Sequence, residues 1–320
     1  MQSRYLPLIA TALIFVIAYA LCYLQYPNIL STRVVGNLFT DNAFLGIAAV
    51  GMTFVIISGG IDLSIGSVIA FTGVFIAAML ANTSLHPLLV FGLALTISAS
   101  FGAMMGGIIH YLQMPPFVVT LAGMFLARGM ALVISTESIP VKHEFYTFIQ
   151  ESFYRLPGGG RITTIGALML IVFIVGILLA HRTKFGANVF ALGGGIQTSK
   201  LMGVPLASTT IGIYAISGFL AGLAGITFSL YTSAGYSLAA VGVELDAIAA
   251  VVIGGALLTG GSGFIAGTLI GVLIMGLIQT YIIFDGTLSS WWTKIVIGIL
   301  LFVFIIMQKG FLLAASAPKK

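Results

Sequence analysis

The chain carries ten apolar runs that are long enough, or nearly long enough, to cross a lipid bilayer. A spanning helix needs about 20 mostly apolar residues, and two of the runs, 43–58 and 247–258, fall short of that length. Only 7% of the 320 residues are charged, against about 25% in a soluble domain, so lipid must solvate most of the surface. The runs cover residues 6–26, 43–58, 64–81, 87–110, 117–135, 163–181, 209–231, 247–258, 263–284 and 292–308.

These runs predict an all-α polytopic membrane protein, because a helix satisfies its own backbone hydrogen bonds in lipid. We expect about ten transmembrane segments in a single domain over residues 1–320, with eight full spans and two re-entrant pieces as the alternative. The first run resembles a signal peptide, but its length and the spans that follow favour a retained helix.

The distribution of charge predicts the orientation. If the N-terminus lies inside, the N-terminus, the loop 182–208 and the C-terminal tail hold seven bases and no acid. The opposite side holds four bases and seven acids. This bias fits the positive-inside rule with both termini in the cytoplasm. The inner bases are Arg4, Arg182, Lys184, Lys200, Lys309, Lys319 and Lys320.

The sequence also repeats itself at an offset of 201 residues. Ile47–Val50 recurs as Ile248–Val251, and in the same register Ser58-Gly59-Gly60 meets Thr259-Gly260-Gly261. Short, glycine-broken segments at matching places in two halves indicate a transport pathway at the repeat interface. We therefore expect repeat halves at about 6–110 and 209–308, with short broken segments near 43–81 and 247–284. With ten crossings the two copies share one orientation.

Polar residues gather at the first break. The expected translocation region comprises Ser58, Gly59, Gly60, Asp62, Ser64, Arg128, Gly260 and Gly261. An acid inside a bilayer is costly and faces protein or water. Asp62 either caps the helix that begins near Ser64, through free backbone N–H groups, or contacts the transported ligand.

Arg128 is the second charge inside a run. A lipid-facing position without a partner is too costly for a guanidinium, so Arg128 should line a polar pathway or pair with a carboxylate from another helix.

Glycine pairs at GxxxG spacing predict close helix packing within the membrane, where small residues let backbones approach. Three pairs lie inside apolar runs: Gly102 with Gly106, Gly218 with Gly222, and Gly267 with Gly271.

The inner loop 182–208 contains a glycine-rich turn at Gly193–Gly195 and then a short helical stretch from Ile196 to Met202. Gly203 suits the left-handed position after a helix, and Pro205 stops its continuation. This small helix could dock a partner or be a plain interfacial loop.

The chain lacks the phosphate-cradling G-x-x-x-x-G-K-[ST] pattern, so we expect no ATP hydrolysis by that route. We also expect no catalytic residues, no cofactor and no metal site, because no His or carboxylate cluster has ligand spacing. The dispersed basic residues fit membrane topology rather than nucleic-acid binding.

Three motifs stand out in the sequence: Ile57–Ser67 (ISGGIDLSIGS), Phe190–Val204 (FALGGGIQTSKLMGV) and Leu245–Gly255 (LDAIAAVVIGG). Together they resemble the membrane permeases of bacterial sugar ABC importers of the ribose, arabinose and xylose type. The resemblance runs from Arg4 to Gln308. Two further stretches, Asp41–Gly46 (DNAFLG) and Asp285–Lys294 (DGTLSSWWTK), look like the permease of galactofuranose importers.

The resemblance implies a permease of an ATP-driven monosaccharide importer in the bacterial inner membrane, with alternating access. Its implied partners are a periplasmic sugar-binding protein, a cytoplasmic ATP-binding subunit and a second, non-identical permease. The family's ATPase-coupling loop maps onto Gly193, Gly194, Lys200, Leu201, Met202 and Gly203, although Gly195 and Thr198-Ser199 depart from the family pattern.

Without the resemblance, an ion-coupled secondary transporter of a small polar solute is the rival interpretation, with Asp62 as its candidate coupling group. A structural scaffold without flux is a third class, which the broken repeats argue against.

Overall fold

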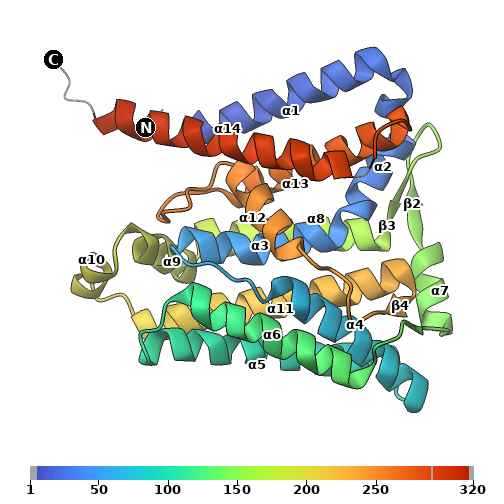
Figure 1. Cartoon of the computed structure of the whole chain (residues 1–320), viewed down its shortest axis with the longest axis horizontal. Coiled ribbons are helices and arrows are strands. Elements are labelled where there is room, and N and C mark those ends of the chain that lie inside the picture. The colour runs from blue at the N-terminus through green and yellow to red at the C-terminus, as the bar shows by residue number, and fades with distance from the viewer. Residues whose placement is uncertain (1–5, 290, 317–320) are drawn as a thin grey trace.

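The computed structural model describes residues 6–289 and 291–316, and shows a bundle of helices that run side by side along its longest axis (Figure 1). We call the end with α9 and α10 the α10 end, and the opposite end, with α7 and the strands, the α7 end. The helices are α1 (Leu6–Gln25), η2 (Pro27–Leu30), α2 (Thr32–Asp41), α3 (Ala43–Ile57), α4 (Ile65–Asn82), α5 (Pro87–Tyr111), α6 (Pro116–Ile134), α7 (Glu144–Glu151), α8 (Thr164–Arg182), α9 (Lys184–Gly194), α10 (Ile196–Leu201), α11 (Leu206–Thr232), α12 (Val243–Ile253), α13 (Ile265–Asp285) and α14 (Trp291–Ser316).

The predicted all-helical architecture with many membrane-length helices is confirmed. Eight described helices are long and apolar enough to cross a membrane, or nine crossings if α2 and α3, bent by 54°, form one span. The short helix α12 is followed by residues 254–264, which form turns and bends. These lead to Phe264, whose ring lies 5.6 Å from that of His181 near the α10 end.

The chain thus passes from the α7 end to the α10 end through α12 and residues 254–264. The short helices α3 and α12 are not among the eight long apolar helices, so the alternative of eight full spans with two shorter segments fits the described residues as well as the larger count does. Three α-helices, α2, α7 and α9, were not expected from the sequence. Arg4, Lys319 and Lys320, used in the charge argument, lie outside the described residues.

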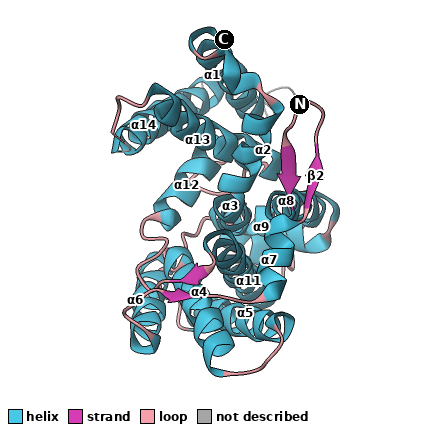
Figure 2. Cartoon of the chain, turned by 90° about the vertical axis from the view of Figure 1, so that its right-hand side faces the viewer, coloured by secondary structure: helices cyan, strands magenta, loops and turns pink. Residues whose placement is uncertain are grey.

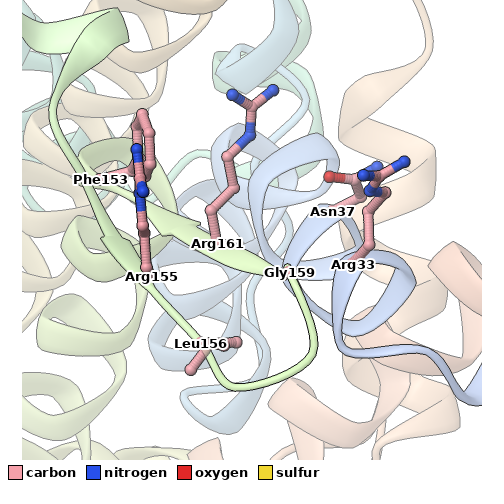
Figure 3. Close-up of a pocket in the computed structure, with 8 residues that line it drawn as sticks. Arg33, Asn37, Phe153, Arg155, Leu156, Gly159 and Arg161 are labelled. Atoms are coloured by element: carbon pink, nitrogen blue, oxygen red, sulfur yellow. The ribbon is translucent and has the colours of Figure 1, made fainter.

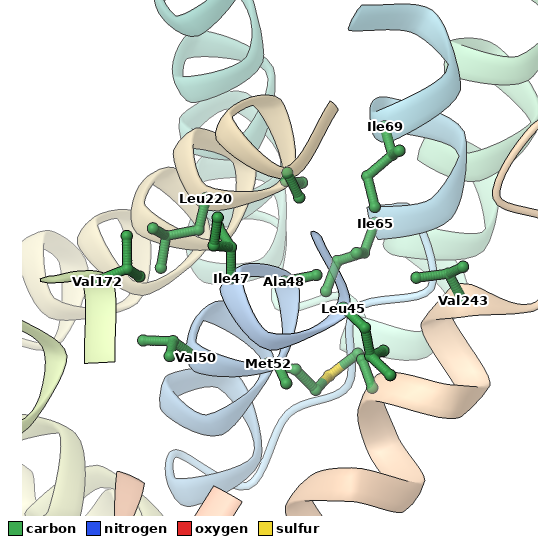
Figure 4. Close-up of a cluster of buried hydrophobic side chains, with 14 of the residues drawn as sticks. Leu45, Ile47, Ala48, Val50, Met52, Ile65, Ile69, Val172, Leu220 and Val243 are labelled. Carbon is green, nitrogen blue, oxygen red and sulfur yellow. The ribbon is translucent and has the colours of Figure 1, made fainter. Parts of the chain in front are cut away.

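Helix α3 lies at the centre of the bundle. Figure 2 shows it between α1, α13 and α14 on one side and α4, α5 and α6 on the other. Its sequence is apolar on every side except for Thr53, and every residue except Phe44 is buried. A helix that is hydrophobic all round is a buried helix. Figure 4 shows α3 side chains packed against Val172 of α8, Leu220 of α11 and Ile65 of α4.

The GxxxG pairs mark real helix crossings. A Cβ on Gly102 would collide with the carbonyl of Tyr214, and a Cβ on Gly218 would collide with the carbonyl of Ser98, so the backbones of α5 and α11 touch. Gly106 and Gly222 lie at the same crossing, within 2.8 Å of Ile211 and Ser98 by the same measure.

The third pair joins α13 to α12. A Cβ on Gly267 would collide with the carbonyl of Gly254, and one on Gly271 with the carbonyl of Ala250. The close-packing prediction is therefore confirmed for all three pairs.

Four short strands lie at the α7 end and form the only sheet structure of the described residues. They are β1 (Ile139–Pro140), β2 (Phe153–Arg155), β3 (Arg161–Thr163) and β4 (Ala234–Gly235), paired antiparallel as β1 with β4 and β2 with β3.

Helix α7 is anchored to α11 through Tyr146, whose hydroxyl lies 2.7 Å from the Ser229 hydroxyl. Burial raises the pKa of Tyr146 to about 12, because a low-dielectric surrounding disfavours the phenolate. The hydroxyl therefore keeps its proton near neutral pH, and the link between α7 and α11 does not depend on pH in that range.

Candidate functional site

The two glycine breaks of the repeat meet at the α10 end. The Gly261 N–H donates to the Ile57 carbonyl at 2.8 Å, and a Cβ on Gly260 would lie 2.8 Å from the backbone nitrogen of Gly59. Gly59 and Gly260 both have positive φ, +85° and +83°, which costs glycine little. The breaks are therefore in backbone contact, as the transport interpretation requires, although Gly59 is exposed and Gly260 and Gly261 are half-buried.

A third backbone segment, the end of α9, completes this contact. A Cβ on Gly193 would collide with the Ile57 carbonyl and with the backbone nitrogen of Gly261, whereas a Cβ on Gly194 would meet nothing within 4 Å. We call Gly59, Gly193, Gly260 and Gly261 the glycine junction. It joins the predicted coupling loop to both broken segments.

The two broken helices end in the same way but not in the predicted register. After α3, Gly59 N–H donates to Ile56 O and Gly60 N–H to Val55 O, both at 2.9 Å. After α12, Gly255 N–H donates to Val252 O at 2.9 Å and Ala256 N–H to Val251 O at 3.2 Å. Both are Schellman motifs, in which a left-handed residue ends the helix.

The expectation that both runs break at the same glycine pair is therefore wrong. Helix α12 ends at Ile253, before Gly254-Gly255, and Gly260-Gly261 lies further along the non-helical stretch that follows. The physical reason is that Gly255 adopts φ +91° first. In addition, a Cβ on Gly254 would lie 2.6 Å from the Gly267 backbone, so α12 ends where it touches α13.

Asp62 is fully buried and bonded within the protein on both oxygens. Its Oδ1 accepts from Ser64 N–H at 2.9 Å and from Ser64 Oγ at 2.6 Å, and its Oδ2 accepts from Ser217 Oγ on α11 at 2.7 Å. The capping interpretation is met only in part, because the one backbone N–H that Asp62 accepts is that of Ser64, before α4 begins. The carboxylate orders Ser64, the residue before the first turn of α4, and also ties the break to α11.

A cavity of about 940 Å³ opens beside the first break. Its polar lining comes from five elements: the break itself, the end of α5, α10, the start of α11 and the loop before α6. The Tyr214 hydroxyl is buried and has no hydrogen-bond partner among the described residues. The polar groups around the cavity include Ser58, His110, Gln113, Lys200, Thr210 and Tyr214.

Sequence reasoning missed the contribution of α11. Thr210, Tyr214 and Ser217 recur at intervals of four and three residues, which places them on one face of a helix. Thr210 and Tyr214 line the cavity and Ser217 bonds Asp62. This polar stripe at helical spacing was the signal in the sequence that could have identified them.

Arg128 bonds backbone carbonyls and forms no direct ion pair among the described residues. Its Nη1 donates to the carbonyls of Ser237 and Ala239, at 2.5 and 2.7 Å, and so holds the loop between α11 and α12. The charge of Glu244 on α12 acts on Arg128 without direct contact, so the expected carboxylate from another helix is present in part. Glu244 is half-buried, and its buried Oε2 is unbonded among the described residues, beside Gly66 of α4. Arg128 therefore anchors a loop by backbone carbonyls and lies apart from the glycine junction.

The predicted coupling loop folds as two helices rather than one. Helix α9 was unforeseen, α10 matches the expected short helix to within one residue, and Gly203 has the expected left-handed φ of +75°. Leu201 and Met202 are 90% and 63% exposed. Lys200 lines the cavity, so the loop contacts both the cavity and the surface.

Asp41 and Asp285, from the stretches that carry the narrower resemblance, lie at the α7 end. Asp41 accepts from Tyr231 and Asp285 accepts from Tyr26, both at 3.1 Å. These carboxylates join helices to one another and lie outside the cavity lining.

The sequence matches a known protein family and several curated relatives. Residues 34–305 match the family described as branched-chain amino acid transport system / permease component. The inner membrane ABC transporter permease protein YjfF of Escherichia coli (strain K12) is 59% identical over 97% of this chain and 94% of its own length.

Two further relatives cover most of the chain. The fructose import permease protein FruG of Bifidobacterium longum (strain NCC 2705) is 34% identical over 100% of this chain and 95% of its own length. The ribose import permease protein RbsC of Escherichia coli (strain K12) is 35% identical over 88% of this chain and 87% of its own length. No solved structure matches the chain.

Proposed function

This chain belongs to the family of branched-chain amino acid transport system permease components, and from that premise we propose that it is the membrane-spanning permease of an ATP-driven monosaccharide importer. The relatives support a sugar as cargo, because two of them are named as import permeases for fructose and ribose. Galactofuranose is the sugar we propose, on the basis of the two stretches at 41–46 and 285–294.

The observation that carries this proposal is the glycine junction. The end of α9 lies against the Ile57 carbonyl and the Gly261 nitrogen without a side chain between them. A force applied to α9 and α10 by a partner therefore reaches both broken segments through backbone contact. The chain itself then needs no ATP-binding site, and hydrolysis is supplied by the partner.

In our proposal the route for the sugar ends at the cavity beside the first break, at the α10 end, where the ATP-binding subunit docks. Hydroxyl, imidazole, amide and ammonium groups line it, and these are the donors and acceptors that hydrogen-bond sugar hydroxyls. The unbonded Tyr214 hydroxyl is available for such a bond. Alternating access would follow when movement at the glycine junction changes the packing of α3 and α12 against α4, α11 and α13.

Membership of an ABC importer family implies an ATPase and a substrate-binding partner. We propose that the exposed Leu201 and Met202 dock a cytoplasmic ATP-binding subunit, because apolar side chains at such a surface favour a protein partner. The further partners are a periplasmic sugar-binding protein and a second, non-identical permease. The chain would lie in the bacterial inner membrane with both termini in the cytoplasm.

The ion-coupled alternative is less well supported. Both oxygens of Asp62 already accept hydrogen bonds from Ser64 and Ser217. A coupling ion or proton would have to displace those donors, and the bonds instead suit a structural carboxylate.

Reconstitution in proteoliposomes tests the proposal. The chain is purified alone and with its ATPase, second permease and binding protein, and uptake of labelled galactofuranose, ribose and fructose is measured. We expect uptake of galactofuranose only in the complete complex with ATP. Uptake by the chain alone under a proton or sodium gradient would overturn the ATP-driven mechanism, and preference for ribose or fructose would overturn the choice of sugar.

The same assay tests the route. Tyr214→Phe removes only a hydroxyl that lacks a partner, so folding should not suffer, while loss of one hydrogen bond to the sugar should lower uptake by up to about tenfold. Tyr111→Phe is the control, because Tyr111 is 70% exposed and does not line the cavity. Equal uptake in both variants would remove Tyr214 from the route.

A further inference from the structure

Three arginines surround a second cavity, far along the chain from the glycine junction. The cavity has a volume of about 670 Å³ and lies between α2 and the β2–β3 hairpin at the α7 end (Figure 3). Arg33, Arg155 and Arg161 are exposed, and none forms an ion pair or hydrogen bond through its guanidinium group with another described residue. The lining residues are Arg33, Asn37, Phe153, Arg155, Leu156, Gly159, Gly160 and Arg161.

Three positive charges without an acid in the lining are costly to hold together, since like charges repel. Arg155 and Arg161 both lie over the Phe153 ring, 5.8 and 5.4 Å from its centroid. This cation–π contact orients the two groups but neutralises neither. The arrangement therefore favours a ligand of net negative charge.

The hairpin that carries two of the arginines is firmly attached to α2. Gly160 N–H donates to Thr32 Oγ1 at 3.1 Å, and the Thr40 and Thr163 hydroxyls lie 2.8 Å apart. Because Gly36 has no side chain, the Arg161 backbone lies directly against α2. The three guanidinium groups are thus presented by a fixed support rather than by a free loop.

The position of the cavity corresponds to the boundary of the membrane. Arg161 lies three residues before Thr164, the first residue of the membrane-length helix α8, and Arg33 lies in the first turn of the bent pair α2–α3. Cationic and aromatic side chains at the ends of spans meet the lipid headgroups. Phe153 and the 72% exposed Tyr154 supply the aromatic part.

An apolar surface continues from this boundary along α8. Ile171, Ile174, Val175 and Leu178 are each more than half exposed, and their spacing of three, one and three residues places them on one helical face. Figure 2 shows the hairpin and α8 at the edge of the molecule rather than at its centre. Acyl chains can therefore lie on α8 while the headgroup occupies the cavity.

We propose that Arg33, Arg155 and Arg161 form a binding site for the phosphate of an anionic phospholipid, with its acyl chains against α8. The planar guanidinium donates two parallel hydrogen bonds to phosphate oxygens, which makes arginine the suitable residue. This site is separate from the sugar route and does not depend on the proposed function.

Native mass spectrometry of the purified chain provides the test. The protein is titrated with phosphatidylglycerol, with zwitterionic phosphatidylethanolamine and with inorganic phosphate, and bound molecules are counted. For Arg155→Gln/Arg161→Gln we expect phosphatidylglycerol affinity to fall by about tenfold or more. The control is Arg182→Gln. It removes an exposed charge at the end of α8 that is farther from the hairpin, and it should leave the affinity unchanged.

Arg155→Lys/Arg161→Lys keeps the charge and should retain a part of the affinity, which separates loss of the site from loss of the fold. Equal lipid binding by the glutamine variant and the wild type would overturn the proposal, as would equal binding of phosphatidylethanolamine. Competition by inorganic phosphate at comparable concentration would identify a free-phosphate site instead. If the glutamine variant bound lipid normally but no longer bound an acidic protein partner, the site would be a protein-binding surface. That result would also overturn the proposal.

Discussion

Asp62 shows how a single buried charge is accommodated within an apolar bundle. Burying a carboxylate is costly unless it is fully hydrogen-bonded, and here three donors from Ser64 and Ser217 meet its two oxygens. The same bonds connect the start of α4 to α11. The residue therefore orders the backbone at the break, and this role predicts how its variants behave.

We expect Asp62→Asn to keep much of the transport and Asp62→Leu to lose it. Asparagine retains an acceptor for Ser64, and its amide can donate to the Ser217 hydroxyl, which also accepts. Leucine leaves buried donors without a partner, at about 1–3 kcal/mol for each. Thermal stability of the detergent-solubilised protein and sugar uptake measure the two effects. Equal loss of uptake in both variants, with stability intact in Asp62→Asn, would show that the charge itself is needed.

At the scale of elements, the packing depends on places where side chains are absent. The α5–α11 and α12–α13 crossings each bring backbones together at glycines, as at Gly102, Gly218 and Gly267. The glycine junction extends this to three segments that are far apart in sequence. Because backbone contacts of this kind leave no side chain to yield, a movement of α9 should be transmitted to α3 and to residues 254–264.

Adjacent glycines of α9 offer a matched test of that transmission. Gly193→Ala places a methyl group against the Ile57 carbonyl and the Gly261 nitrogen, whereas Gly194→Ala enters open space. We expect Gly193→Ala to reduce ATP-driven uptake strongly and to cost about 1–3 kcal/mol of stability through overpacking. Gly194→Ala should leave both unchanged.

Uptake and binding of the ATPase subunit are the measurements for these two variants. Retained ATPase binding with lost uptake would place the defect in transmission rather than in docking. If Gly193→Ala transports sugar as well as Gly194→Ala does, the glycine junction has no part in coupling.

The whole molecule is polarised along its longest axis. The described bases Arg182, Lys184 and Lys200 lie at or beside the α10 end, while α7 and its neighbouring loops at the other end carry Glu137, Glu144 and Glu151. From the positive-inside rule we predict that the α10 end faces the cytoplasm. Four bases of the segments predicted to lie outside depart from this pattern, Lys142 and the three arginines of the proposed lipid site, and the three arginines are the ones that gather around one cavity.

Labelling of single cysteines tests this orientation. In a Cys22→Ala background, Lys200→Cys on α10 and Tyr154→Cys on the hairpin are treated with a membrane-impermeant maleimide. Both positions are exposed. We expect Tyr154→Cys to react in spheroplasts and Lys200→Cys to react only in inverted vesicles. The opposite pattern would reverse the orientation and remove α10 from the side where an ATPase could bind.

Much of the fold was predictable because membrane spans are local features. The length of an apolar run decides whether lipid can solvate it, so most helices lie within a few residues of the runs, for example α5 at Pro87–Tyr111 against 87–110. The GxxxG spacing is also a local feature, and it identified glycines at which two helices come close. The short run 43–58 was predicted as a broken segment, and α3 occupies it, but its buried position at the centre of the bundle was not predicted.

The tertiary structure decided what depends on neighbours. Helix α12 ends at Ile253 because Gly254 touches α13 and Gly255 can turn first, and Arg128 bonds carbonyls of a loop more than a hundred residues away. The contact of Gly193 with both breaks and the bond of Ser217 to Asp62 likewise join distant segments. Sequence alone determined which stretches enter the membrane, because solvation acts on each run separately. Only the fold determined which polar and glycine residues meet, because that depends on which helices lie side by side.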